Sequence, residues 1–197
     1  AGELGATIEL ATAHVNSIAA RTPTAVGDGE NWDYSLDRCP LGTTDALLSG
    51  TPSDLPEFGS TTMFFVQRNT DGRGAVACYF DTVVSNESIH LVFSAVALTS
   101  DQEASLAERS TTTSGDAATG GSFYTSCDQD DLRNRRCRST WVRGGLGVGL
   151  DIYGWPVPGT STDPIAVQAW LAPKISAIVN ALAATNPSEI HVGDLVP

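Results

Sequence analysis

Three consecutive stretches between residues 61 and 98 carry the residue patterns of β-strands, and they limit the possible folds of this chain more than any other feature. Asp71 and Gly72 separate the first two stretches and are a strong signal for a hairpin turn. Apolar side chains alternate along the second stretch, whereas the third is a longer apolar run that is typical of a central strand. We therefore expect strands at residues 61–68, 75–84 and 89–98.

Further strand patterns precede and follow this region, and helical patterns lie near both ends of the sequence. Alternating apolar residues predict strands within residues 31–39, 122–127, 138–142 and 146–154. Apolar side chains recur every three or four residues over 2–21 and 164–184, which predicts two amphipathic helices, the second kinked at Pro173. Because runs of strands occur without regularly alternating helices, we predict an α+β fold in which both long helices pack on one face of an antiparallel sheet.

Two shorter segments lie between the predicted strands. Ser100 and Glu103 fit a capping box and predict a short helix that ends near Arg109. Residues 110–121 contain no side chain larger than threonine or aspartate, so we expect them to form a flexible loop. We assign residues 1–197 to one extracytoplasmic domain that contains this loop.

The chain is strongly acidic. Its formal net charge is −12, with 23 acidic and 11 basic residues, and Lys174 is its single lysine. This charge repels polyanions, so nucleic acids and anionic membrane surfaces are poor partners. Hydrophobic residues make up 41% of the sequence, which is enough for a sizeable core and argues against general disorder.

The four cysteines include no Cys-x-x-Cys pair, so their spacing does not favour a structural zinc site. Of the three possible pairings we favour Cys127 with Cys137, which flank a predicted hairpin loop, and hence Cys39 with Cys78. Disulfides persist in oxidising compartments, which predicts an exported protein. The sequence shows no signal peptide and no apolar run of about 20 residues. We therefore expect a mature extracellular or cell-surface form without a membrane span, from which any N-terminal lipid anchor has been removed.

The segment between Cys127 and Cys137 begins a concentration of positive charge. Five of the ten arginines lie between residues 133 and 143. Guanidinium groups suit carboxylates and phosphates, so this segment is the candidate site for a small anionic ligand or a protein partner. The alternative is that the acids at 128, 130 and 131 neutralise the arginines and stiffen the loop without a ligand. We favour this alternative because the acids lie so close to the arginines in the sequence. The candidate binding residues are Arg133, Arg135, Arg136 and Arg138.

Motifs for catalysis or cofactor binding are weak. His90 and Ser94 share a strand face, but no G-x-S-x-G motif exposes a serine nucleophile, so we predict no catalytic residue. The stretch GGLGVGLDIYG lacks the third glycine of a dinucleotide-binding loop, and no two histidines have the helical spacing of metal ligands. We therefore expect no metal, no nucleotide and no other cofactor. Trp155, in the loop GWPVPG, is the one tryptophan that we expect at a surface cleft.

The gross layout of the chain resembles that of uncharacterised exported actinobacterial proteins, which are often lipoproteins. The features that carry the resemblance are the opening amphipathic helix, the cysteine-bearing strand NWDYSLDRCP and the closing unit from LGVGLDIYG to AWLAPKISAIVNALA. The closing strand–helix unit is also similar to the extracellular sensor domains of mycobacterial kinases. Both resemblances imply an envelope-facing role in binding a ligand or a partner.

These observations favour a non-enzymatic extracytoplasmic binding or protein-interaction domain of a bacterial cell-envelope protein. Two alternatives are a secreted hydrolase whose site is assembled from distant residues, and a small inhibitor or immunity-type protein. A deep pocket with buried titratable groups is expected for the hydrolase. A shallow or apolar cleft is expected for the binding domain, and a flat acidic face for the inhibitor.

Overall fold

The computed structural model describes residues 2–22, 33–50, 61–68, 73–84, 87–128, 136–154 and 164–195. Its strands are β1 (Asp33–Leu36), β2 (Thr61–Arg68), β3 (Gly74–Val84), β4 (Glu87–Ala97), β5 (Thr112–Asp116), β6 (Gly121–Asp128), β7 (Arg136–Arg143), β8 (Leu146–Tyr153) and β9 (Val192–Leu195). Its α-helices are α1 (Gly2–Ala19), α2 (Thr44–Leu48), α3 (Ser100–Arg109), α4 (Pro164–Leu171) and α5 (Ile175–Ala184). Two 3₁₀ turns are η1 (Ala172–Lys174) and η2 (Pro187–Glu189).

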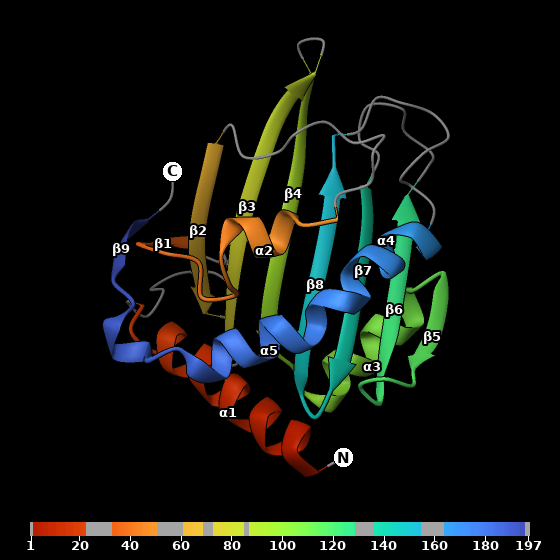
Figure 1. The fold of residues 1–197 in the computed structure, drawn as a ribbon, viewed down its shortest axis with the longest axis horizontal. Helices are drawn as coiled ribbons and strands as arrows, with labels where there is room; N and C mark the ends of the chain where they lie inside the picture. The colour runs from red at the N-terminus through yellow and green to blue at the C-terminus, as the bar shows by residue number, and fades with distance from the viewer. Residues whose placement is uncertain are drawn as a thin grey trace.

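One antiparallel sheet organises the fold. Its nine described strands pair in the order β5-β6-β7-β8-β4-β3-β2-β1-β9. The helices α1, α4 and α5 lie across one face of this sheet (Figure 1). Strand β4 pairs with β3 on one side and β8 on the other, which is the central position that its long apolar run predicts. The predicted α+β class with a large antiparallel sheet is therefore confirmed.

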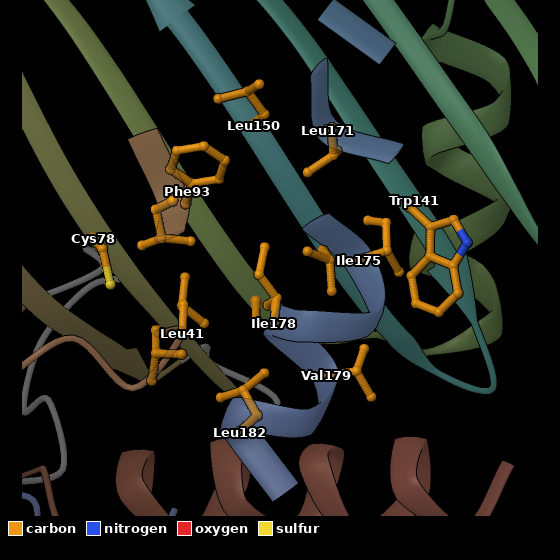
Figure 2. Close-up of a cluster of buried hydrophobic side chains, with 14 of the residues drawn as sticks. Leu41, Cys78, Phe93, Trp141, Leu150, Leu171, Ile175, Ile178, Val179 and Leu182 are labelled. Carbon is orange, nitrogen blue, oxygen red and sulfur yellow. The ribbon is translucent and has the colours of Figure 1, made fainter. Parts of the chain in front are cut away.

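The main hydrophobic core lies between this sheet face and the helices. Phe93 of β4, Leu150 of β8 and Trp141 of β7 are buried among side chains of the helices (Figure 2). Ile175 and Ile178 of α5 are buried in the same cluster. Alternate strand positions and every third or fourth helix position thus supply the core, as the apolar periodicity of the sequence indicates.

The single long helix expected over 164–184 is interrupted, so α1 is the only long α-helix in the described part of the chain. The turn η1 separates α4 from α5. Pro173 explains this break, because proline has no amide hydrogen to donate and its ring crowds the preceding turn. The whole segment Pro164–Ala184 has the length and the mean hydropathy (1.4) of a helix that could cross a membrane. In this fold its apolar stripe is buried in the core, at Val167, Leu171, Ile175, Ile178 and Leu182.

Helix α3 lies on the opposite face of the sheet, so the helices do not all share one side (Figure 1). Its N-cap is Thr99, one residue before the expected Ser100. Thr99 Oγ1 accepts a hydrogen bond from the Gln102 amide at 3.1 Å, and Gln102 Oε1 accepts one from the Thr99 amide at 2.8 Å. This is the predicted reciprocal capping, shifted by one position. None of the ten residues of α3 is buried, so this helix only partly covers its face.

The two edges of the sheet are the parts that the sequence predicts least well. The loop expected over 110–121 contains strand β5, which pairs with β6 through Thr113 and Tyr124, among others. Backbone hydrogen bonds hold an edge strand, and threonine favours extended backbone, so β5 needs no large apolar side chain. Strand β9 pairs with β1 at the other edge and is not predicted from the sequence.

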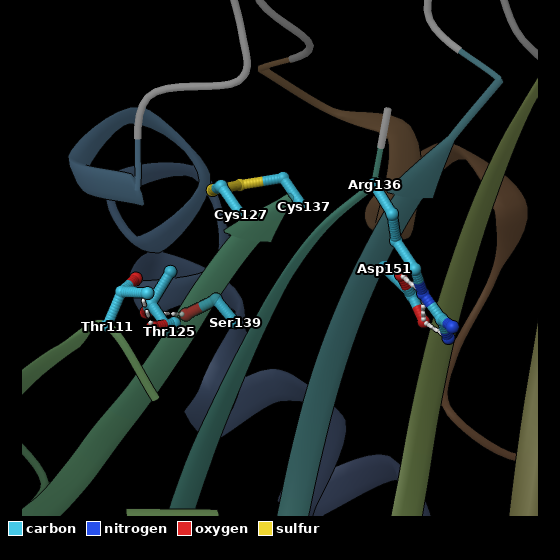
Figure 3. Close-up of a disulfide and its surroundings, with 7 residues drawn as sticks. All are labelled: Thr111, Thr125, Cys127, Arg136, Cys137, Ser139 and Asp151. Carbon is cyan, nitrogen blue, oxygen red and sulfur yellow. Dashed lines mark hydrogen bonds and ion pairs between the residues drawn. A yellow bond between two sulfur atoms is a disulfide. The ribbon is translucent and has the colours of Figure 1, made fainter. Parts of the chain in front are cut away.

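Two disulfides join Cys39 to Cys78 and Cys127 to Cys137, the two pairs predicted from the sequence. The first ties the segment after β1 to the middle of β3, with α-carbons 5.7 Å apart. The second joins directly opposed residues of β6 and β7, with α-carbons 4.0 Å apart (Figure 3). Disulfides are compatible with an extracellular location.

Gly121 leaves room for the buried indole of Trp141. A Cβ at Gly121 would lie 2.1 Å from Trp141 Nε1, which donates a hydrogen bond to Thr119 Oγ1 at 2.8 Å. We therefore expect Gly121→Ala to displace the indole and to lower the free energy of unfolding by about 1.5 kcal/mol, because overpacking a well-packed core forces such shifts. Urea denaturation measures this loss.

Gly115 on the paired strand β5 provides the control for that substitution. No atom lies within 4 Å of a Cβ added at Gly115. Gly115→Ala is therefore expected to change the free energy of unfolding little. An equal loss in the two alanine variants would show that contact with Trp141 is not what requires glycine at position 121.

Candidate functional site

The sheet face opposite α1, α4 and α5 carries an open hollow of about 1100 Å³. Outward-facing residues of β2, β3, β4, β7 and β8 form its floor, and Gln102, Leu106 and Arg109 of α3 line one side. We refer to this hollow as the sheet-face cavity. The antiparallel register sets side chains of neighbouring strands directly opposite each other, so residues distant in sequence form rows across the floor.

Two of these rows are polar. The first crosses β7, β8, β4 and β3 and consists of Arg136, Tyr153, His90 and Asp81. The second crosses the same strands and consists of Arg138, Asp151, Val92 and Tyr79. The register therefore brings together ionisable residues that are distant in the sequence, such as His90 and Tyr153.

A single carboxylate in these rows binds two guanidinium groups. Asp151 is only 7% exposed. Its Oδ1 accepts a hydrogen bond from Arg136 Nε at 2.8 Å, and its Oδ2 accepts from Arg138 Nε at 2.9 Å and from the terminal Nη2 of Arg138 at 2.7 Å. Figure 3 shows Arg136 of the first row reaching Asp151 of the second. Two positive charges face one negative charge, so this cluster has a net charge of +1.

Both arginines keep surface available for a ligand. Their side chains are about half exposed, at 50% for Arg136 and 49% for Arg138. The hydrogen bonds to Asp151 raise the pKa of Arg136, so its guanidinium stays charged at any physiological pH. This guanidinium also lies over the ring of Tyr153, 5.9 Å from its centroid, which is a cation–π distance. The two groups are thus held in place and still reachable from the cavity.

His90 lies between two tyrosines beside this cluster. Its ring centroid is 5.2 Å from that of Tyr79 and 4.8 Å from that of Tyr153, and its Nδ1 shares a hydrogen bond with the Tyr79 hydroxyl. Burial lowers the pKa of His90, and the nearby Asp81 carboxylate opposes that shift. Burial also raises the pKa of Tyr79 to about 12, with smaller contributions from Tyr153 and Asp81. At neutral pH these three rings therefore offer neutral hydrogen-bonding groups rather than charges.

A third arginine lies at the end of α3. Arg109 donates from Nε to the Ser105 carbonyl at 3.2 Å and from Nη2 to Ser105 Oγ at 2.7 Å. It lines the sheet-face cavity and also a smaller adjoining hollow of about 220 Å³, where Arg136 and Arg138 are lining residues too. Asp151 is the one acidic residue among the described residues that line these hollows, because Asp81, at the β3 end of the first row, is not a lining residue. The basic character of this region therefore contrasts with the net charge of −12 of the chain.

The rest of the cavity floor is small or apolar. A third row of residues, Thr140, Gly149, Ser94, Ala77 and Phe65, follows the two polar rows. A fourth includes Gly147, Val96, Ala75 and Gln67. The two glycines allow close packing, since a Cβ at Gly149 would lie 2.7 Å from Ser94 Oγ and one at Gly147 would lie 2.8 Å from Leu98 Cδ1. Small side chains in these rows leave the space that forms the hollow.

The structure places two of the five predicted binding residues in this site. Arg136 and Arg138 line the cavity. Arg133, Arg135 and Trp155 lie outside the described residues, as do the acids at 130 and 131. Asp151 of the neighbouring strand is an acidic partner of both described arginines.

Four site residues were not singled out from the sequence: Asp151, Tyr153, Tyr79 and Arg109. Alternation along β8 does place Asp151 and Tyr153 on one face, but their arginine partners depend on the register between β7 and β8. His90 and Ser94 do share a strand face, yet four residues of a strand separate them by about 13 Å. In the described structure His90 is hydrogen-bonded to Tyr79, so this histidine and serine do not form a nucleophile–base pair.

A second hollow of about 590 Å³ lies on the helix side, between α2 and the α4–α5 segment. Among the described residues that line it, Lys174 is the one charged residue; it is buried, and that burial lowers its pKa. Lys174 Nζ donates to the Ser49 carbonyl and, at 3.3 Å, to Ser49 Oγ. A lysine beside the last carbonyls of a helix stabilises that helix end, so we interpret Lys174 as a link between α2 and the core.

Comparison of this chain with protein-family models, curated proteins and solved structures found no match. Within the described ranges, no group of three or more His, Cys, Asp or Glu side chains is placed to hold a metal ion. The chemistry of the site therefore has to be inferred from its own residues. These residues offer one excess positive charge, two forked hydrogen-bond donors and an adjoining apolar floor.

Proposed function

We propose that this chain is a non-enzymatic, extracytoplasmic binding domain that takes a small anionic ligand in the sheet-face cavity. The observation that supports this most is the sharing of the Asp151 carboxylate by Arg136 and Arg138. A single arginine would neutralise Asp151, so the second leaves a fixed positive charge in a protein of net charge −12. Arginine forks bind carboxylates and phosphates through charge-assisted hydrogen bonds, which are about twice as strong as neutral ones.

The proposed setting is the cell envelope of a bacterium of actinobacterial type, as a secreted protein or a lipoprotein. The two disulfides support an oxidising compartment. The negative charge of the chain as a whole supports a role that does not involve nucleic acid. The positive charge of the site, in a chain of net charge −12, supports an anionic ligand.

The alternative functions have less support from the site. A hydrolase of the serine type requires a nucleophile beside its histidine, and His90 is hydrogen-bonded to Tyr79. An inhibitor or immunity-type protein was expected to present a flat acidic face, whereas the described site is a hollow with a basic floor. The binding function therefore fits the described residues best.

A titration followed by nuclear magnetic resonance tests this proposal. Butyrate is added to ¹⁵N-labelled protein while the Nε–Hε signals of the arginines are recorded. We expect saturable shifts for Arg136 and Arg138 and no saturable shift for Arg38, which lies at the surface in an ion pair with Glu189. Equal, non-saturating shifts of all arginine signals would mean a general salt effect and would refute the proposed site.

A further inference from the structure

The sheet-face cavity has two chemically different ends. One end is charged. It contains Arg136 and Arg138 at the start of β7, together with Asp151 near the end of β8. Beyond them, the side chains of the third and fourth rows are small or apolar except for Gln67 of β2. At that side Val96 of β4 and Leu98 after β4 line the cavity. A ligand that lies along the strands therefore meets charge at one end and hydrocarbon at the other.

We propose that the ligand is an amphipathic monoanion, an aliphatic carboxylic acid whose carboxylate binds Arg136 and Arg138 and whose chain extends toward Val96 and Leu98. This inference rests on the proposed function, because it specifies the class of anion that the same site takes. It adds a second requirement, namely that the apolar part of the ligand contributes to affinity.

The charge of the cluster favours a single negative charge on the ligand. Two guanidinium groups and the Asp151 carboxylate give a net charge of +1. One carboxylate neutralises this charge and can accept hydrogen bonds from both arginines, whose forks match its two oxygens. A ligand with more negative charge would also face the Asp151 carboxylate, which is fixed at the cavity floor.

The apolar end has surface that is not covered by the described fold. Val96 and Ala75, which are paired in the fourth row, are only partly buried. From Asp151 to Gly147 the strand spans four residues, or about 13 Å, so an extended aliphatic chain can lie along the floor from the arginines to the apolar end. Burying each methylene of such a chain is worth roughly a fourfold gain in affinity.

A chain-length series tests this inference. The dissociation constants of butyrate, hexanoate, octanoate and decanoate are measured with the whole chain at constant ionic strength by competition or calorimetry. We expect each two-carbon extension to lower the dissociation constant by roughly 15-fold until the apolar end is filled, since two methylenes are buried per step. Decanol, which has the same chain length as decanoate and no charge, is expected to bind at least tenfold more weakly than decanoate.

Ala75→Phe provides a matched variant that blocks the apolar end. Ala75 lies in the fourth row, opposite Val96, and is far from the arginine rows. In this variant we expect decanoate to bind no more tightly than butyrate. Unchanged butyrate binding shows that the variant is folded and that its arginine end is intact. Decanoate binding that stays as tight as in the unmodified protein would contradict the proposed path of the chain.

The outcomes separate this inference from the proposed function. If butyrate binds and longer acids bind no more tightly, the amphipathic ligand is refuted while anion binding stands. If decanol binds as tightly as decanoate, the arginines do not select the ligand and the inference is overturned. If none of the acids binds, the proposed function itself is refuted.

Discussion

Replacing Cys39 and Cys78 together by alanine is expected to lower the free energy of unfolding by about 4 kcal/mol. The bond spans 39 positions of sequence, and a crosslink that closes a loop of this length reduces the conformational entropy of the unfolded chain by about that amount. Cys78 is fully buried in the middle of β3, and Cys39 packs against the same core. The variant therefore loses the link that holds the segment around α2 against the sheet.

Chemical denaturation of the oxidised protein and of the double variant measures this loss. The comparison variant replaces Cys127 and Cys137 by alanine. Its bond spans only 10 positions and joins two strands that the β6–β7 ladder already pairs. The loop-entropy estimate for this shorter loop is about 3 kcal/mol. A larger loss for the Cys127–Cys137 variant than for the Cys39–Cys78 variant would show that loop length does not determine the stabilisation.

The sequence predicts the centre of the sheet well because burial there leaves a clear residue pattern. β2, β3, β4 and β8 carry apolar side chains on the helix-facing side, and a core position tolerates little else. The edges leave weaker patterns. β5 and β9 need only backbone pairing on one side, so polar residues such as Thr112 and Asp116 are compatible with strand or loop.

The candidate site is only partly predictable for a different reason. The density of arginines near the second disulfide points to Arg136 and Arg138 from the sequence alone. Asp151 and His90 join them through pairing between β7, β8 and β4, and the order of these strands in the sheet is not their order in the chain. The spacing of residues in the sequence does not show which strands pair, because the partner of a strand depends on the packing of the whole sheet.

Arg138→Gln is expected to weaken anion binding by about 30- to 100-fold. The substitution lowers the net charge of the cluster from +1 to zero and removes one forked donor. Hydrogen bonds to charged groups contribute about 1.5–3 kcal/mol, or roughly 10- to 150-fold in affinity, and the expected loss lies within this range. Arg136 still pairs with Asp151 in this variant, so the buried carboxylate keeps a partner and the protein is expected to stay folded.

Arg38→Gln is the control for this substitution. It makes the same change in net charge, but Arg38 is exposed, pairs with Glu189 at 3.6 Å and is not a lining residue of the sheet-face cavity. Exposed ion pairs contribute little to stability, so this variant should fold and bind like the unmodified protein. A loss of affinity in both variants would point to the overall charge of the protein rather than to the site.

The most direct measurement is therefore the dissociation constant of octanoate for the unmodified protein, Arg138→Gln and Arg38→Gln, determined by calorimetry in one buffer. Binding of a carboxylate between Arg136 and Arg138 predicts a 30- to 100-fold weaker constant for Arg138→Gln and an unchanged constant for Arg38→Gln. Equal constants for all three proteins would contradict the proposal that the arginine pair of the sheet-face cavity binds the anion.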